Sequence, residues 1–398
     1  MHGLNPVCNR KFNFFLIYIK LRIAVNTRLL LKNKLEGIGW FSYETLRRIT
    51  KQHQEHQFYF MFDRQFDESF IFSGNITPVV IPPQARHPLL YYLWFEKSIP
   101  RILKKIQPDL FFSPDGYLSL SSPVKSMNVI HDLNFEHYPE DLPYPERTFY
   151  RHYFPQYARK ACRIATVSEF SKRDIINQYH VSPEKIDVVY NGANDRYSPL
   201  SESEKFLVRA KYSEGIPYFV FVGALHPRKN LANLFRAFDL FRQETGINMK
   251  LLTIGQKKWW TKSIKEAYDK MQFNKDVGFC GRLEPLELNR VIASATALTY
   301  VSYFEGFGIP ILEAFYCETP VITSNVTSMP EVAGDAAILI DPFSVKSICE
   351  GMMKIVSDPS ISISLNEKAR ERRQVFNWQR TAGLLWDSME KALDSKKP

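Results

Sequence analysis

The stretch VFVGALHPRKN, residues 220–230, joins a strand, a glycine turn and the start of a helix. Its first three residues are apolar, which predicts a buried strand that ends at Gly223. Arg228 and Lys229 come just before a helix that is predicted to begin near Asn230. Two cations ahead of a helix N-terminus suit a diphosphate, because the helix dipole and the free backbone N–H groups favour anions there. The other interpretation is a solvated basic turn.

The same alternation of strand and helix continues toward the C-terminus. After the predicted helix at residues 230–245, further helices are expected near residues 286–295 and from Pro310 onward. Strand-like runs of apolar residues lie at 249–255, 277–281, 295–302, 320–325 and 336–341. Apolar strands separated by helices indicate a parallel sheet that is covered on both faces.

The first half of the chain shows the pattern as well. Strand-like runs lie at residues 21–26, 57–62, 109–113, 126–132, 163–168 and 186–192, with helices expected at 40–52, 89–106, 144–161 and 168–179. The predicted fold is therefore α/β, with two doubly wound Rossmann-like domains facing a cleft.

Predicted domain boundaries follow from this pattern and from the Ser-, Pro- and Glu-rich stretch YSPLSESEKF, which is the candidate linker. Residues 1–20 are assigned to an extension, 21–197 to the first domain, 198–375 to the second, and 376–398 to a helix that packs back on the first domain.

Composition narrows the class of protein. Apolar residues make up 45% of the 398, which excludes a largely disordered chain, and the formal net charge of +10 favours an anionic partner. The five scattered cysteines are typical of reduced thiols in a cytosol. The apolar run from Phe12 to Ile19 is about half of the roughly 20 residues that a membrane span needs, so we expect a cytoplasmic protein.

A second motif, YFEGFGIPILEAF at residues 303–315, places Glu305 and Glu313 on either side of a glycine-rich loop. Pro310 suits the first turn of a helix, so Glu313 falls near that helix's start, where the dipole favours a carboxylate. Both acids are predicted to point into the cleft and to accept hydrogen bonds from sugar or ribose hydroxyls. A capping role would explain Glu313 but not Glu305.

Two weaker candidates lie in the first domain. Gly37 and Gly39 are expected between the first strand and its helix, where backbone N–H groups can approach a ligand closely; an ordinary tight turn is the alternative. His131 and Asp132 follow a strand at the ligand side of such a sheet, although a histidine there can also be purely structural.

Together, VGALHPRKN, YFEGFGIPILEAF, PVITSNVTSMPEVAGDAAILIDP and ATVSEFSKRDI resemble the retaining nucleotide-sugar glycosyltransferases of family 4, which have the GT-B fold. The resemblance runs from about Leu21 to the C-terminal helix. It implies that Arg228 and Lys229 hold the donor diphosphate, that Glu305 binds hydroxyls of the transferred sugar, and that Glu313 binds the ribose.

The same resemblance implies further donor contacts. His131 would lie near C6 of the sugar, and the remaining donor-binding set would be Gly37, Gly39, Asp132, Gly223 and the amides of Phe307, Gly308 and Ile309. The sequence departs from the family pattern at three places: Val301-Ser302 replaces the usual Pro-Ser, Glu318 stands where Gly is usual, and Trp40 stands where Arg is common.

The implied reaction is the transfer of a hexose, with retention, from a nucleoside diphosphate sugar to a glycan or lipid-linked acceptor. GDP-mannose is the favoured donor and UDP-glucose or UDP-galactose the second choice. No metal and no cofactor are expected, because no two aspartates have the Asp-any-Asp spacing and Arg228 and Lys229 offer the positive charge. A nucleotide-sugar epimerase and a non-catalytic sugar-nucleotide-binding protein remain alternatives; no nucleic-acid recognition motif is present.

The segment 91–105 has two interpretations. Its aromatic residues Tyr91, Tyr92, Trp94 and Phe95 are followed by Lys97, Arg101, Lys104 and Lys105. This pattern fits a peripheral contact with the inner face of the cell membrane, and it also fits a core helix with a solvated basic face.

Overall fold

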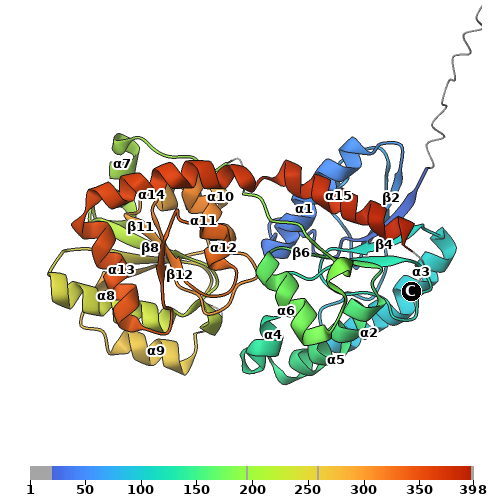
Figure 1. The fold of residues 1–398 in the computed structure, drawn as a ribbon, viewed down its shortest axis with the longest axis horizontal. Helices are drawn as coiled ribbons and strands as arrows, with labels where there is room; N and C mark the ends of the chain where they lie inside the picture. Colours follow the sequence, from blue (N-terminus) through green and yellow to red (C-terminus); the bar gives the residue numbers. More distant parts are fainter. Residues whose placement is uncertain (1–19, 194–195, 258–259, 396–398) are drawn as a thin grey trace, which may run out of the picture.

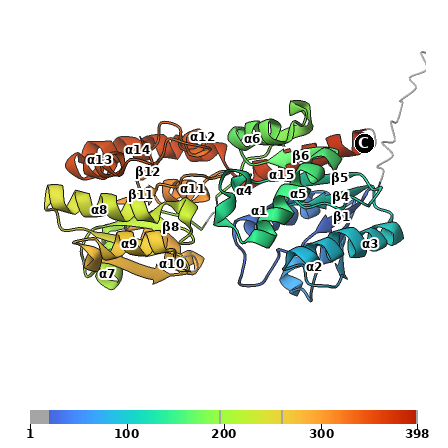
Figure 2. The same ribbon diagram turned by 90° about the horizontal axis from the view of Figure 1, so that it is seen from below.

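A computed structural model describes residues 20–193, 196–257 and 260–395 of the chain. It contains two parallel sheets, each with helices on both faces, in two halves that lie side by side (Figures 1 and 2). The predicted α/β fold class with two doubly wound, Rossmann-like units is confirmed.

The N-terminal half is built on a seven-stranded sheet in the order β3-β2-β1-β4-β5-β6-β7. The strands are β1 Arg22–Asn26, β2 Gln57–Phe62, β3 Ile76–Val80, β4 Leu110–Ser113, β5 Ser126–Val129, β6 Arg163–Thr166 and β7 Ile186–Val188. The helices that surround it are α1 Gly37–Gln52, α2 Pro88–Leu93, α3 Ile99–Ile106, α4 Asn134–His137, α5 Tyr144–Lys160 and α6 Glu169–Tyr179.

The C-terminal half is built on a six-stranded sheet in the order β10-β9-β8-β11-β12-β13. The strands are β8 Tyr218–Val222, β9 Lys250–Ile254, β10 Val277–Gly281, β11 Ala297–Tyr300, β12 Val321–Ser324 and β13 Ile338–Ile340. The helices are α7 Glu202–Ser213, α8 Leu231–Thr245, α9 Lys262–Asp269, α10 Pro285–Ala293, α11 Ile309–Tyr316, α12 Met329–Ala333, α13 Val345–Ser357 and α14 Pro359–Arg372.

The last helix, α15 Trp378–Asp394, returns from the C-terminal half and packs on α1 and β6 of the N-terminal half (Figure 1). The first residue of α15, Trp378, lies close to Gly192 in the connection after β7. A Cβ added to Gly192 would lie 2.5 Å from the backbone nitrogen of Trp378. Thr381 also donates a hydrogen bond of 2.7 Å to the carbonyl of Tyr190. The two halves are therefore joined twice, by the connection after β7 and by the start of α15.

One strand was missed, and two local expectations are wrong. Strand β3 was not predicted because Pro78 interrupts its apolar pattern, yet β3 is an edge strand, where the missing N–H of a proline is tolerated. Helix α1 begins at Gly37, so Gly37 and Gly39 belong to its first turn and not to a preceding loop. The second part of the expected linker is helical, because Ser201 and Glu204 form a capping box that begins α7.

The segment 91–105 has its aromatic side chains in the core. Trp94 and Phe95 are fully buried, and Trp94 donates a hydrogen bond of 2.8 Å from its indole to the carbonyl of Ile81. Tyr91 and Tyr92 are partly buried and pack on the same core. The side chains of Lys97, Arg101, Lys104 and Lys105 are exposed. The aromatic residues are thus core residues, and only the basic residues are available to an anionic surface.

Candidate active site

The turn between β8 and α8 holds Arg228 and Lys229 in a single turn of 3-10 helix, Pro227–Lys229. His226 caps this turn, and Asn230 adopts a left-handed backbone with φ of 62°. The Asn230 amide fixes the turn by donating to the carbonyls of Val301, at 2.9 Å, and Pro342, at 2.7 Å. The two cations therefore project from a rigid turn.

Glu305 lies between the two cations. Its carboxylate oxygens are 2.8 Å from Nη1 of Arg228 and 2.5 Å from Nζ of Lys229. Glu305 and Lys229 are only 6% and 7% exposed. Arg228 is partly buried. The acid and the cations were predicted to have separate ligand contacts, and their pairing was not predicted. The three side chains form one cluster, named here the Arg228–Lys229–Glu305 cluster.

The pKa values in this cluster reflect burial and charge together. Burial opposes the ionisation of Glu305, but the charges of Arg228 and Lys229 outweigh it and lower its pKa to about 2. Burial lowers the pKa of Lys229 to about 8, against the opposing charge of Glu305. Although burial acts against its charge, the carboxylates of Glu305 and Asp132 raise the pKa of Arg228. At neutral pH the cluster carries two positive charges and one negative.

Tyr300, at the end of β11, belongs to this site although the sequence analysis did not single it out. Its hydroxyl accepts a hydrogen bond of 2.7 Å from Nζ of Lys229, whose ammonium also lies 4.7 Å from the centre of its ring. Its position at the carboxyl end of a parallel strand, where ligands bind in such sheets, was the signal that could have found it.

Glu313 lies in the second turn of α11 and not at its start, so its ionisation is governed by burial rather than by the helix dipole. Burial raises the pKa of Glu313 to about 7, and a hydrogen bond with Tyr197 opposes that shift. Burial and the negative charges of Glu305 and Glu313 raise the pKa of Tyr300, so this tyrosine lies near both acids of the motif.

His131 follows β5 and reaches the glycine-rich loop of the other half. A Cβ on Gly306 would lie 2.3 Å from the carbonyl oxygen of His131 and 2.8 Å from Cβ of Asp132. Only a glycine allows this approach, so Gly306 is one of the points at which the two halves meet. The carboxyl ends of both sheets face this junction.

The imidazole of His131 is held in one orientation. Its Nε2 donates a hydrogen bond of 2.8 Å to the carbonyl of Pro114, and its ring meets that of Phe41 edge to face at 5.0 Å. Burial lowers the pKa of His131, so the ring is neutral at pH 7 and its Nδ1 is an acceptor.

The other predicted donor contacts are backbone positions. Gly223, with φ of 149°, lies under the Lys229 side chain, and Gly308, with φ of 108°, is the N-cap of α11, which Ile309 begins. The Phe307 side chain is buried against Tyr190 and Phe376. Gly37 and Gly39, in the first turn of α1, follow the carbonyl of Leu35, which accepts a 3.3 Å hydrogen bond from Arg282 of the C-terminal half.

Comparisons with known proteins match both halves. A family model described as "Glycosyltransferase Family 4" matches residues 35–197, and one described as "Glycosyl transferases group 1" matches residues 204–372. The chain belongs to the family 4 glycosyltransferases. The resemblance stated from the sequence motifs is thereby confirmed.

Curated relatives of the glycosyltransferase include two enzymes of bacterial O-antigen synthesis. O-antigen chain mannosyltransferase B from Escherichia coli is 26% identical over 378 residues, which cover 88% of this chain and 94% of that protein. O-antigen chain mannosyltransferase RfbU from Salmonella typhimurium is 27% identical over 256 residues, which cover 63% of this chain and 68% of that protein.

A solved structure confirms the GT-B fold. HepE from Anabaena, determined in complex with UDP and glucose, superposes with a TM-score of 0.72 at 15% identity and covers 93% of this chain and 99% of its own. In the described part of the glycosyltransferase, no helix combines the length and the apolar character that crossing a membrane requires.

Proposed function

We propose that this glycosyltransferase moves a mannosyl group from GDP-mannose to a hydroxyl of a glycan or lipid-linked acceptor in cell-surface polysaccharide synthesis, with retention at the anomeric carbon. The observation that carries the proposal is the Arg228–Lys229–Glu305 cluster at the carboxyl ends of β8 and β11. Mannose is favoured because the relatives above are named O-antigen mannosyltransferases. The structure of HepE with UDP and glucose supports a nucleotide-sugar donor.

The proposed roles follow from charge. In the reaction the bond between the anomeric carbon and the diphosphate breaks, and the acceptor oxygen bonds to that carbon on the same face. The acceptor proton passes to the departing phosphate oxygen. Arg228 and Lys229 stabilise the departing diphosphate, because preorganised cations act most strongly in a site shielded from water. Glu305 orients both cations and accepts hydrogen bonds from sugar hydroxyls.

Further donor contacts complete the proposal. Glu313 accepts hydrogen bonds from the ribose, and Nδ1 of His131 accepts one from the sugar. Asp132 lies next to His131 on the N-terminal side of the junction, and the backbone at residues 307–309 contacts the sugar or the diphosphate. Gly37, Gly39 and Gly223 allow the backbone to approach the phosphates.

We propose that the reaction needs no divalent metal, since the two cations supply the charge that a metal would supply. A panel of GDP-mannose, UDP-glucose and UDP-galactose in a thermal-shift assay, in the presence of EDTA, tests donor and metal together. GDP-mannose should raise Tm most. A larger shift with a UDP-sugar would contradict the donor assignment, and a shift that requires added magnesium would contradict metal independence.

Two other functions fit less well. A nucleotide-sugar epimerase needs an acid and a base that act at the sugar, and none of the described residues is assigned to either role. A non-catalytic sugar-nucleotide-binding protein would not need a buried Lys229 whose pKa lies near 8. Release of free sugar and nucleoside diphosphate from the donor distinguishes the transferase from both.

A further inference from the structure

The end of α1 and the turn into β2 carry the sequence His53-Gln54-Glu55-His56. This turn precedes β2, so it lies at the amino edge of the N-terminal sheet, opposite the carboxyl edge that faces the junction of the two halves. None of the roles proposed above uses these residues.

The three side chains converge. Oε1 of Glu55 lies 3.6 Å from Nδ1 of His53 and 3.5 Å from Nε2 of His56. One ligand atom from each residue lies within 4.8 Å of the other two. His56 is buried, whereas Glu55 is exposed, so the group opens to solvent on the carboxylate side.

The two imidazoles are held in place by the C-terminal helix. Their rings are parallel to within 2°, and Trp386 of α15 stacks on His53 at 3.7 Å and on His56 at 5.3 Å. The Trp386 indole donates a hydrogen bond of 2.9 Å to Glu390. Packing thus orders the two histidine rings before any ligand binds, which lowers the entropic cost of binding.

We propose that His53, Glu55 and His56 form a binding site for a divalent transition metal of the zinc class. Two imidazoles and one carboxylate are a donor set that zinc accepts, and solvent on the open side can supply the fourth ligand.

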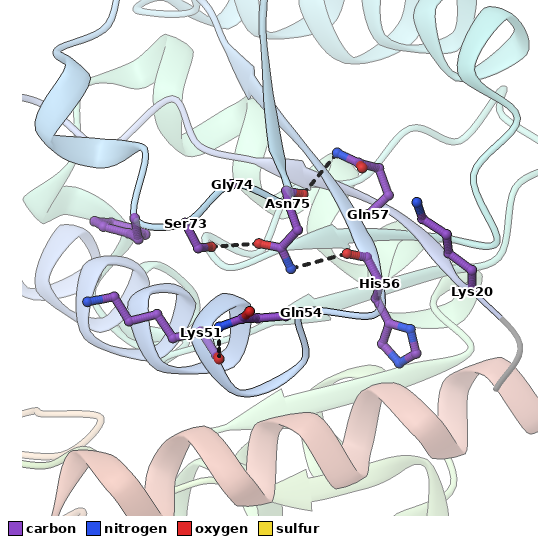
Figure 3. A pocket seen from close by; sticks show the side chains of 9 residues that line it. Lys20, Lys51, Gln54, His56, Gln57, Ser73, Gly74 and Asn75 are labelled. Carbon is purple, nitrogen blue, oxygen red and sulfur yellow. Dashed lines mark hydrogen bonds between the residues drawn. The ribbon is translucent and has the colours of Figure 1, made fainter. Parts of the chain in front are cut away.

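Two features oppose the metal and limit its affinity. The backbone N–H of Leu21 donates a long hydrogen bond of 3.4 Å to Nδ1 of His56; a ring that binds metal through Nε2 carries its proton on Nδ1 and loses this bond. Lys20 and Lys51 line the pocket beside the group, and their positive charges oppose a cation. His56 also lines this pocket and is directed toward α15 (Figure 3). The negative charges of the Glu55 and Glu390 carboxylates, which both lie near His56, partly offset these positive charges.

The test is a calorimetric titration of Zn²⁺ into the tag-free full chain at neutral pH, with His53→Gln and Glu55→Gln as the altered ligands. His152→Gln is the matched control, since His152 is exposed and lies outside the group. We expect the wild type to bind one zinc ion at this group. Its affinity for that ion should be at least tenfold weaker in His53→Gln and Glu55→Gln and unchanged in His152→Gln. Equal affinity in all four chains, or no stoichiometric binding to the wild type, would overturn the proposal.

Trp386 provides a second readout that does not depend on activity. Because its indole stacks on His53, Ni²⁺ bound at the group should quench its fluorescence, and the quenching should be lost in Trp386→Phe while Ni²⁺ still binds. The chain has six tryptophans, so the difference between the two titrations isolates Trp386. Equal quenching with and without Trp386 would place the metal elsewhere and overturn the proposal.

Discussion

Lys229 is the residue on which the proposed chemistry depends most. Its ammonium is held by Glu305 and Tyr300, and Arg228 remains paired with Glu305 if Lys229 is removed. Lys229→Ala should therefore fold and should lower the rate of GDP-mannose turnover by about 10²–10³, the range seen when an electrostatic stabiliser is lost.

Lys346→Ala is the control for this change, because Lys346 is exposed on α13 and pairs only weakly, at 3.9 Å, with Glu350. Initial rates of sugar release by the three chains measure the effect. Near-normal turnover by Lys229→Ala would rule out the assignment of this residue to the leaving diphosphate.

The pKa of Lys229 predicts the alkaline limit of activity. Burial lowers that pKa to about 8, so the fraction of protonated ammonium falls as pH rises through 8, and the stabilisation of the leaving group falls with it. The profile of kcat/KM, which reports the free enzyme, should decline above about pH 8. Lys229→Arg keeps its charge at these pH values and should flatten this decline, even if its absolute rate is lower. A wild-type profile that stays level to pH 10 would contradict the role of Lys229.

Gly306 is predicted to be intolerant of any side chain. An alanine there would bring its Cβ to 2.3 Å from the carbonyl of His131, so the two halves could meet only after a backbone shift. Gly306→Ala should lower kcat/KM for GDP-mannose by tenfold or more. Gly74→Ala is the control, because a Cβ on Gly74 meets nothing within 4 Å. Equal kcat/KM in Gly306→Ala and wild type would show that catalysis does not need this approach.

Secondary-structure elements with strong apolar patterns were predicted, although the predicted ends of some, such as α1, differ from the observed ends. Strand β2 was predicted at its observed residues because its run of apolar residues from Phe58 to Phe62 is uninterrupted. Strand β3 was missed because the pattern is broken by Pro78, and α1 starts earlier than predicted because glycines were taken as a turn. Glu318, where the family usually has glycine, has a left-handed backbone with φ of 54° and a bidentate ion pair with Arg370.

Helix α6 is capped by its own Ser168, and it receives a further cap from the other half of the molecule. The carboxylate of Glu331, on α12, accepts hydrogen bonds from the backbone N–H groups of Glu169, at 2.7 Å, and Phe170, at 3.0 Å. A cap of this kind is worth about 0.5–2 kcal/mol. Because Glu331 spans the junction, this free energy favours the arrangement in which the halves meet.

Glu331→Gln should therefore lower kcat/KM, because the arrangement in which the halves meet is less favoured, and should change Tm only slightly. Asp358→Ala is the control, since Asp358 caps α14 within the C-terminal half by accepting from the backbone N–H of Ser360 at 2.9 Å, and alanine cannot replace that cap. That variant should lower Tm and leave kcat/KM unchanged. A lower Tm with an unchanged kcat/KM in both variants would contradict the proposed role of the Glu331 cap.

At the scale of the whole molecule, the sequence predicted two doubly wound units but not how they meet. The pairing of Glu305 with Arg228 and Lys229 joins motifs about 75 residues apart within one half, and each motif was assigned to a ligand instead. The contacts of Gly306 with His131 and of Ser168 with the carbonyl of Gly306, at 2.7 Å, cross between halves. Local patterns carry no information on such contacts, because they depend on how segments far apart in the chain are placed relative to one another.

Membrane contact remains a prediction, now limited to charge. Since Trp94 and Phe95 are buried, attraction to anionic lipids rests on exposed Lys97, Arg101, Lys104 and Lys105, each worth roughly 1 kcal/mol at such a surface. The chain should float with anionic vesicles at low salt and be released at high salt. The double variant Lys104→Glu/Lys105→Glu should not float. Binding that persists at high salt, or none at low salt, would contradict this expectation.

The most direct test of the proposed function is the configuration of the sugar that the enzyme releases from GDP-α-mannose in the presence of EDTA. Proton NMR of the first turnovers, recorded before mutarotation, identifies the anomer without requiring a known acceptor. Retaining chemistry at the Arg228–Lys229–Glu305 cluster predicts α-mannose from the wild type and far less from Lys229→Ala. β-Mannose as the first product, or no release by the wild type until a divalent metal is added, would contradict the account.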